Sequence, residues 1–140
     1  MPKPRPSVST RKAPRKTGKR KGKYNASGRH VNGIWCASKA EADRFEQLLR
    51  MAEAGVIEDL ETQPPFKISL NGKHICTYKA DFRYRTYRPE LRAYDVLIED
   101  VKGMILDVYL LKKKLVEAQY GVSIVEIPGR KVPEWEGRTP

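Results

Sequence analysis

The sequence predicts one domain of the α/β (α+β) class, with a mixed β-sheet flanked by helices. A chain of 140 residues has room for one modest hydrophobic core. Two segments, about 38–54 and about 106–120, carry apolar residues at helical spacing. The stretches between and after them are apolar or alternate between apolar and polar residues, as strands do. The predicted order is helix, three strands, helix, strand.

Charge divides the chain into an arm and a domain. Residues 1–30 hold eleven Lys or Arg and no Asp or Glu, whereas the remainder holds seventeen of each sign. The arm is rich in Pro and has few apolar side chains, so we predict a disordered basic arm over 1–32, a domain over 33–127 and an irregular tail over 128–140. The arm is either a solubilising tail or a segment that binds a polyanion such as nucleic acid. Its candidate contacts are Arg15, Lys16, Lys19, Arg20, Lys21 and Lys23.

Other classes of protein fit the sequence less well. No stretch approaches the ~20 apolar residues of a membrane span, and no apolar segment near the N-terminus resembles a secretion signal, so a cytoplasmic location without a membrane partner is expected. Two cysteines and two histidines could together bind zinc, but their spacing matches no common zinc-finger pattern. The four residues are His30, Cys36, His74 and Cys76. Cysteines of the core or the surface are the default interpretation.

The first helix begins with a capping pattern. Ser38 is placed as the N-cap and Glu41 at the third helical position, and Gly55 offers a C-terminal stop. The core stripe of this helix consists of Ala42, Phe45, Leu48, Leu49 and Ala52. Glu41 has two interpretations, because a capping glutamate needs no further function, yet this residue lies beside the apolar stripe. The local pattern favours the cap.

The strands that follow place one acid among basic residues. Residues 57–63 and 66–70 are expected to be extended, and Asn71-Gly72 predicts a hairpin turn into a strand over 73–86. One face of that strand would carry Cys76, Tyr78, Ala80, Phe82 and Tyr84. The opposite face would carry Thr77, Lys79, Asp81, Arg83 and Arg85. Asp81 is therefore either part of a charge-paired exposed face or a candidate site residue.

The next strand, over 94–102, carries the most informative spacing. Asp100 and Lys102 lie two positions apart, so their side chains point to the same side of the sheet. A carboxylate and an amine that converge at a strand end suit metal-assisted phosphodiester hydrolysis, although such triplets also mark solvated strand ends. The nearly continuous apolar run leaves open whether Glu99 or Asp100 points inward. The spacing to Lys102 favours Asp100.

The second helix would bury one apolar stripe and expose its lysines. Its predicted core stripe is Val108, Leu111, Leu115 and Ala118, and the helix stops at Gly121. Tyr109, Lys112, Lys113 and Lys114 fall outside that stripe, where they would be solvated or would hold a phosphate backbone. Residues 122–127 form a strand that returns beside the strand over 94–102.

Together these motifs resemble the PD-(D/E)XK nuclease superfamily. The shared order is a helix with Glu, a strand with Asp, a strand with Asp-x-Lys, a helix and a strand. A small phage-associated family of that superfamily, formerly of unknown function, is more similar still. The matching segments are Ser38-Lys39-x-Glu41, Gln63-x-x-Phe66, Tyr78-x-Ala80-Asp81-Phe82, Glu99-Asp100-Val101-Lys102-Gly103 and Lys112-Lys113-Lys114-Leu115. Ala80 stands where the superfamily pattern has proline.

The resemblance implies a restriction-endonuclease-like core and a metal site. Asp81 and Asp100 would be the metal carboxylates, the Val101 carbonyl a further ligand, and Glu41 would reach the site from the first helix. Oxygen ligands of this kind suit Mg²⁺ or Mn²⁺, and no organic cofactor is implied. Lys102 would orient or deprotonate the attacking water. Gln63 would be an accessory or a structural residue.

The leading expectation is a metal-dependent endonuclease of a phage or prophage in a bacterial host cell. By analogy with the superfamily, its substrate would be branched DNA such as a Holliday junction, and symmetric cleavage of two strands would need a homodimer. Arg83, Arg85, Tyr109 and the three lysines of the second helix are the candidate DNA contacts of the domain. The alternatives are a catalytically silent nucleic-acid-binding protein of the same fold and a packaging protein that coats nucleic acid with its arm. An ion-pair cluster without catalysis is the plainest interpretation of the acids and Lys102.

Overall fold

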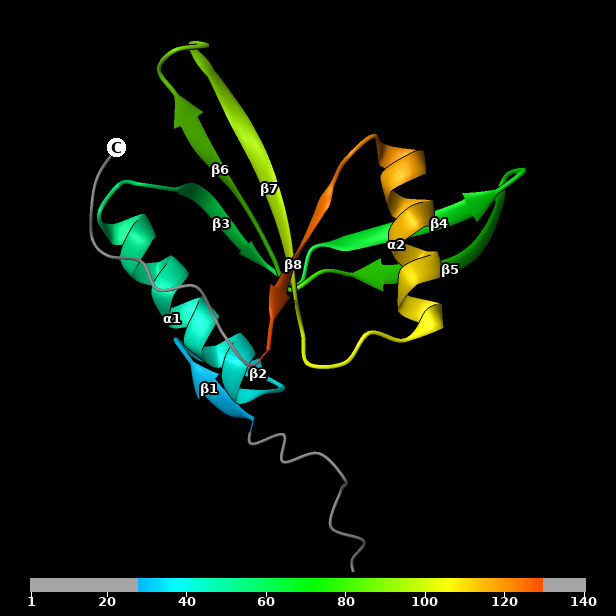
Figure 1. The fold of residues 1–140 in the computed structure, drawn as a ribbon, viewed down its shortest axis with the longest axis horizontal. Coiled ribbons are helices and arrows are strands. Elements are labelled where there is room, and N and C mark those ends of the chain that lie inside the picture. Colours follow the sequence, from blue (N-terminus) through cyan, green and yellow to red (C-terminus); the bar gives the residue numbers. More distant parts are fainter. Residues whose placement is uncertain (1–27, 130–140) are drawn as a thin grey trace, which may run out of the picture.

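The computed structural model describes residues 28–129 and has a mixed α+β fold with a mixed sheet and two helices (Figure 1). The elements are β1 (Arg29–Val31), β2 (Ile34–Cys36), α1 (Lys39–Glu53), β3 (Glu58–Thr62), β4 (Pro65–Leu70), β5 (Lys73–Lys79), β6 (Phe82–Arg88), β7 (Ala93–Lys102), α2 (Asp107–Tyr120) and β8 (Ile124–Pro128). The predicted arm contacts between Arg15 and Lys23 lie outside the described residues, as does most of the predicted tail. Neither described helix is long and apolar enough to cross a membrane.

Four strands form the central sheet, in the order β3-β6-β7-β8. β6 pairs antiparallel with both β3 and β7, whereas β8 runs parallel to β7. A parallel neighbour needs a long crossover, and α2 supplies it. The strand expected over 94–102 is confirmed as β7, which has a hydrogen-bonded neighbour on each side.

The first helix begins and ends as the sequence predicts. Ser38 is the N-cap, and its hydroxyl accepts a hydrogen bond from the Glu41 amide at 3.1 Å. Ala42, Phe45 and Leu48 are buried, which confirms the core stripe. The chain leaves the helix at Gly55, whose φ of +73° favours glycine.

The prediction of one continuous strand over 73–86 is wrong. The chain breaks between β5 and β6, and Asp81 lies in the break rather than in a ladder. β5 pairs only with β4, as the Asn71-Gly72 turn predicts, and forms a separate two-stranded sheet. Tyr78 and Phe82 are both buried, but the break places them in two different core clusters. Five strands therefore lie between the helices, instead of three.

The N-terminal boundary of the fold also differs from the prediction. β1 and β2 form a short hairpin, and Val31 and Cys36 belong to the core beside α1. Residues 29–32, which we assigned to the disordered arm, are thus part of the domain. The strands have only three residues each, too few to show a periodicity in the sequence.

The second helix has the predicted position but presents a different face to the core. Tyr109 and Val116 are its buried residues, whereas Val108, Leu111 and Leu115 are exposed. The predicted core stripe of α2 is therefore wrong. The reason is that α2 packs against the β4-β5 hairpin and the sheet through its aromatic and β-branched side, where Phe66, Tyr78 and Ile98 lie.

Two core clusters lie on opposite faces of the central sheet (Figure 1). α1 and the β1-β2 hairpin cover one face, and α2 with the β4-β5 hairpin covers the other. Because side chains alternate along β7, Leu97 and Val101 belong to the α1 side and Ile98 to the α2 side. This alternation decides where the acids of β7 point.

Candidate functional site

Asp100 is completely buried on β7, at 0% exposure, and holds the centre of the candidate site. The Tyr78 hydroxyl donates a hydrogen bond to its Oδ2 atom, and the Lys102 Nζ atom lies 2.8 Å from its Oδ1 atom. Apart from this ion pair, the buried Oδ1 atom has no hydrogen-bond partner among the described residues. A buried carboxylate oxygen with a vacant lone pair is suited to accept a further cation. The same-face prediction for Asp100 and Lys102 is confirmed.

Asp81 joins this site from the link between β5 and β6. Its Oδ2 atom accepts a hydrogen bond from the Val101 amide at 2.6 Å. The backbone of Asp81 is held between Gln63, whose amide donates to its carbonyl at 2.8 Å, and Glu99, whose carbonyl accepts from its amide at 3.0 Å. Burial and the neighbouring Asp100 carboxylate raise the pKa of Asp81 to about 7. The two aspartates therefore share one electrostatic environment.

Glu41 approaches the site from α1 but is engaged as a cap. Its Oε2 atom accepts a hydrogen bond from the Ala37 amide at 3.0 Å, one residue before the N-cap. The capping interpretation is confirmed, with the partner shifted by one residue from the usual capping box. Burial is the main cause that raises the pKa of Glu41, and the charge of Asp100 adds to it. Glu41 is thus both a cap and an electrostatic neighbour of Asp100.

The carboxylates do not form a closed ligand set in this conformation. Among residues 28–129, no three His, Cys, Asp or Glu side chains are grouped closely enough to hold a metal ion. Asp81 and Asp100 still provide oxygen donors of the type that Mg²⁺ and Mn²⁺ prefer, and the Oδ1 atom of Asp100 accepts no hydrogen bond among the described residues beside its ion pair with Lys102. The residues therefore fit a divalent cation held by two aspartates. Glu41 uses its Oε2 atom for the Ala37 amide, which leaves its Oε1 atom as the candidate for a third ligand.

The apolar run left open which of Glu99 and Asp100 points inward, and the structure shows that both are buried, on opposite faces of the sheet. On the α1 side, Arg44 contacts Glu99 through two nitrogens, at 2.8 Å and 2.5 Å, and also donates to Gln47. The Tyr84 hydroxyl donates to the same carboxylate at 2.5 Å. This network fixes α1 against the strand that carries Asp100. Glu99 is therefore a structural partner of α1, and Asp100 is the acid of the site.

The α2 side of the site carries a second acid that the sequence reasoning missed. Glu126 on β8 is paired in register with Asp100 and points to the same face. It accepts a hydrogen bond from the Tyr109 hydroxyl at 3.3 Å and forms an ion pair with Lys113 at 2.7 Å. The Lys102 Nζ atom lies 4.6 Å from the centre of the Tyr109 ring. The sequence signal that could have identified Glu126 is that it is the single acid within the apolar run of β8.

The three consecutive lysines of α2 point in different directions. Lys113 faces the site through Glu126, Lys112 is partly buried, and Lys114 is exposed. The structure therefore brings Tyr109 and Lys113 to the site and leaves Lys114 on the surface.

Other predicted residues lie away from this cluster or are already paired. Arg83 forms an ion pair with Glu61 at 2.5 Å. Arg85 contacts Glu58 at 3.1 Å and Asp59 at 2.7 Å. This is the charge-paired surface that was the alternative interpretation of the basic face. The Gln63 side chain is exposed, and its contact with the site is the backbone hydrogen bond to Asp81.

Tyr78 is the other site residue that the sequence reasoning did not assign. Its side chain is buried and its hydroxyl is directed at Asp100, so it orients the central carboxylate. Burial and that hydrogen bond raise the pKa of Tyr78 well above its usual range, which keeps it a donor. The motif Tyr78-x-Ala80-Asp81 contained this residue, but the direction of the Tyr78 side chain relative to Asp100 depends on the break after β5.

The structure places the four residues of the zinc interpretation apart from one another. Cys36 lies in the core cluster beside α1, and Cys76 packs against the cluster beside α2. His30 contacts the Trp35 ring, and His74 lies 3.0 Å from the Thr77 hydroxyl. Both cysteines are free.

The fold and the site define a mixed α+β protein in which two aspartates, a lysine and a tyrosine meet at the end of a sheet strand. Residues 21–127 match the family described as Protein of unknown function (DUF1064), and the chain belongs to that family. No curated protein and no solved structure matches the chain.

Proposed function

We propose that this protein is a metal-dependent DNA endonuclease of the PD-(D/E)XK kind, with the corresponding restriction-endonuclease-like core. The observation that carries the proposal is the convergence of Asp81, Asp100 and Lys102, in which the buried Oδ1 atom of Asp100 has the Lys102 ion pair but no hydrogen bond among the described residues. Burial of two like charges is costly unless a cation relieves it. The raised pKa of Asp81 expresses that cost in the metal-free protein.

Asp81 and Asp100 would hold a Mg²⁺ or Mn²⁺ ion, with the Val101 carbonyl and Glu41 as further ligands. When bound, the cation supplies Lewis-acid stabilisation of the phosphate charge. Tyr78 holds Asp100 in one orientation through its hydroxyl. Lys102 pairs with Asp100 in the metal-free state; in the proposed reaction it would orient the attacking water and neutralise charge on the scissile phosphate.

The substrate class follows from analogy and from the charge of the chain. Ten of the eleven basic residues of segment 1–30 precede β1, and Tyr109 and Lys113 flank the acids. A chain that combines a basic segment with an acidic centre suits a phosphodiester polyanion. We propose branched DNA of a phage or prophage as the substrate, because the motif order resembles that of the phage-associated family and of junction resolvases.

A second candidate function is a catalytically silent protein that binds nucleic acid. The observation that favours it is that Lys102 is already paired with Asp100 and Glu41 is already bound to Ala37. Such a cluster is stable without a metal ion. This protein would bind DNA in the presence of a chelator and cleave none.

The test uses labelled four-way junction, flap, duplex and single-stranded DNA with Mg²⁺, with Mn²⁺ and with EDTA. The matched variants are Asp100→Asn and Asp95→Asn, which remove one carboxylate each from β7. Asp95 is partly exposed and paired with Arg88, and it lies five residues away along the strand, roughly 17 Å. Cleavage that needs the cation, persists in Asp95→Asn and disappears in Asp100→Asn supports the endonuclease. Binding without cleavage on every substrate supports the silent protein.

A further inference from the structure

The outer side of α2 has the pattern of a buried helix but lies at the surface. Val108, Leu111 and Leu115 are 63%, 59% and 38% exposed, although their spacing is that of a core stripe. The opposite side, with Tyr109 and Val116, packs into the domain. At 3.6 residues per turn the two stripes are about 120° apart. A helix with apolar residues on two sides typically packs against protein on both sides.

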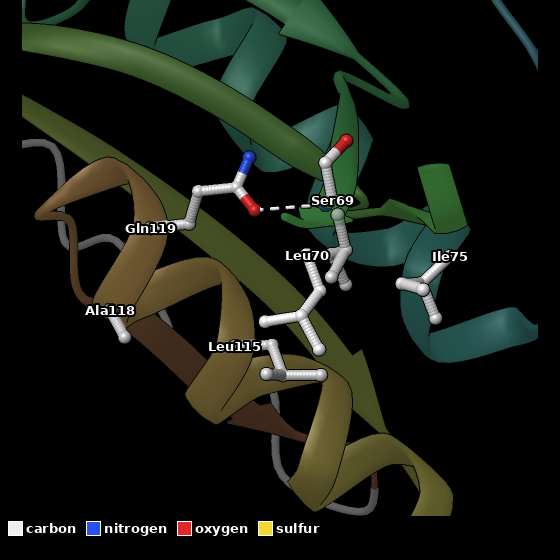
Figure 2. A pocket seen from close by; sticks show the side chains of 7 residues that line it. Ser69, Leu70, Ile75, Leu115, Ala118 and Gln119 are labelled. Atoms are coloured by element: carbon white, nitrogen blue, oxygen red, sulfur yellow. Dashed lines mark hydrogen bonds between the residues drawn. The ribbon is translucent and has the colours of Figure 1, made fainter. Parts of the chain in front are cut away.

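A groove continues this apolar surface onto the β4-β5 hairpin. Its volume is about 380 Å³, and it is lined mainly by Ile68, Leu70, Ile75, Leu115 and Ala118. Figure 2 shows Leu115 of α2 beside Leu70 of β4, with Ile75 of β5 farther along and Gln119 bonded to the backbone of Ser69. Leu70 and Ile75 are 65% and 57% exposed. The helix ridge and the groove are therefore adjacent parts of one surface.

We propose that a second copy of this chain covers this surface, with α2 packed against α2 across a two-fold axis. A two-fold interface brings the same surface together from both copies, so it must contain both a projection and a recess. Leu111 and Leu115 form a projecting ridge, and the groove between α2 and the hairpin is the recess. Each copy therefore offers both parts.

The size of the surface agrees with this occupant. With roughly 100 Å² for each exposed large side chain, the five residues Leu70, Ile75, Val108, Leu111 and Leu115 expose about 500 Å². The largest apolar patch on a typical monomer is about 300–600 Å² and often has a function. Ile105 and Leu106, exposed in the loop that leads into α2, bring the area closer to the about 800 Å² per partner of a stable interface.

The charges of the domain agree with a second copy as well. Residues 28–129 hold fifteen basic and fifteen acidic side chains, so two domains can approach without net repulsion. The whole excess of charge lies outside this part of the chain. The interface also lies on the side of α2 that faces away from Tyr109 and Lys113, so the acidic site stays accessible in the dimer. The proposal does not depend on the proposed endonuclease activity.

Sedimentation velocity of the full-length protein over a wide concentration range tests the proposal. The test variants are Leu111→Asp on the ridge and Ile75→Asp at the groove, and the control is Leu91→Asp, which is 64% exposed in the β6-β7 turn. Far-UV circular dichroism establishes that each variant is folded. The wild type and Leu91→Asp are expected to be dimers. Each test variant should weaken self-association by at least about a hundredfold, because a two-fold interface would bury two added carboxylates.

Two results would overturn this assignment. A wild type that stays monomeric at every concentration shows that no second copy covers the surface. A dimer that persists unchanged in both Leu111→Asp and Ile75→Asp shows that the interface is elsewhere.

Discussion

Replacing Asp81 by Asn should stabilise the metal-free protein near neutral pH but have little effect in mild acid. The folded state raises the pKa of this carboxyl from 3.8 to about 7, because burial and Asp100 disfavour its charge. A raised pKa gives a contribution to stability that is fully present below the unfolded pKa and is lost as the pH rises through about 7. A shift of about three units corresponds to about 4 kcal/mol, and partial access to solvent lowers the expected effect to about 2–4 kcal/mol.

Asparagine is neutral at every pH and can still accept the hydrogen bond from the Val101 amide. The free energy of unfolding should therefore be similar for the variant and the wild type near about pH 4. It should exceed that of the wild type by about 2–4 kcal/mol near about pH 8. Urea unfolding in the presence of EDTA, at a series of pH values, measures both. Asp95→Asn provides the baseline for loss of an exposed aspartate on β7.

Adding Mg²⁺ should reverse this order, because a ligand stabilises the form that binds it more tightly by mass action. The wild type is then expected to gain more stability than Asp81→Asn. The reasoning is refuted if the variant is less stable than the wild type near neutral pH without metal. A difference that does not change with pH would also refute it, since the effect would then not come from ionisation.

Three further predictions concern the cap, the buried network and the arm. Ser38→Ala should lower the free energy of unfolding by about 1 kcal/mol, measured with urea, and no loss would mean that the cap contributes nothing. Glu99→Gln should cost about 3–5 kcal/mol, whereas the double variant Arg44→Met with Glu99→Leu should cost less in the same assay. Deleting residues 1–27 should reduce the slope of log DNA affinity against log salt by about 5 while cleavage continues; loss of cleavage would contradict the separation of arm and site.

The sequence predicted those parts of the fold that local patterns determine. The capping pattern at Ser38 and the Asn71-Gly72 turn each depend on residues close in the chain, and both are confirmed. The spacing of Asp100 and Lys102 needs only the alternation of a strand, and their contact is confirmed as well.

The errors arise where a choice depends on the neighbours in space. Leu111 and Tyr109 lie on two apolar sides of the same helix, and only the packing of the β4-β5 hairpin selects the side that is buried. The break at Asp81 is similar, because the apolar residues alternate straight through it and only the separate pairing of β5 and β6 reveals it. The partners of Glu99 could not be predicted either, since Arg44 lies 55 positions away in the chain.

The adjacent acids of β7 also fix the register of that strand. A shift of one residue moves every side chain to the opposite face of the sheet. In one direction it would bring Ile98 against the buried guanidinium of Arg44, and in the other it would put Val101 in the place of Asp100. Either alternative leaves a buried charge without its carboxylate or removes the central acid of the site. Arg44 against Glu99 and Tyr78 against Asp100 therefore together select the one alignment of β7 in which Asp100 also lies near Asp81 and Lys102.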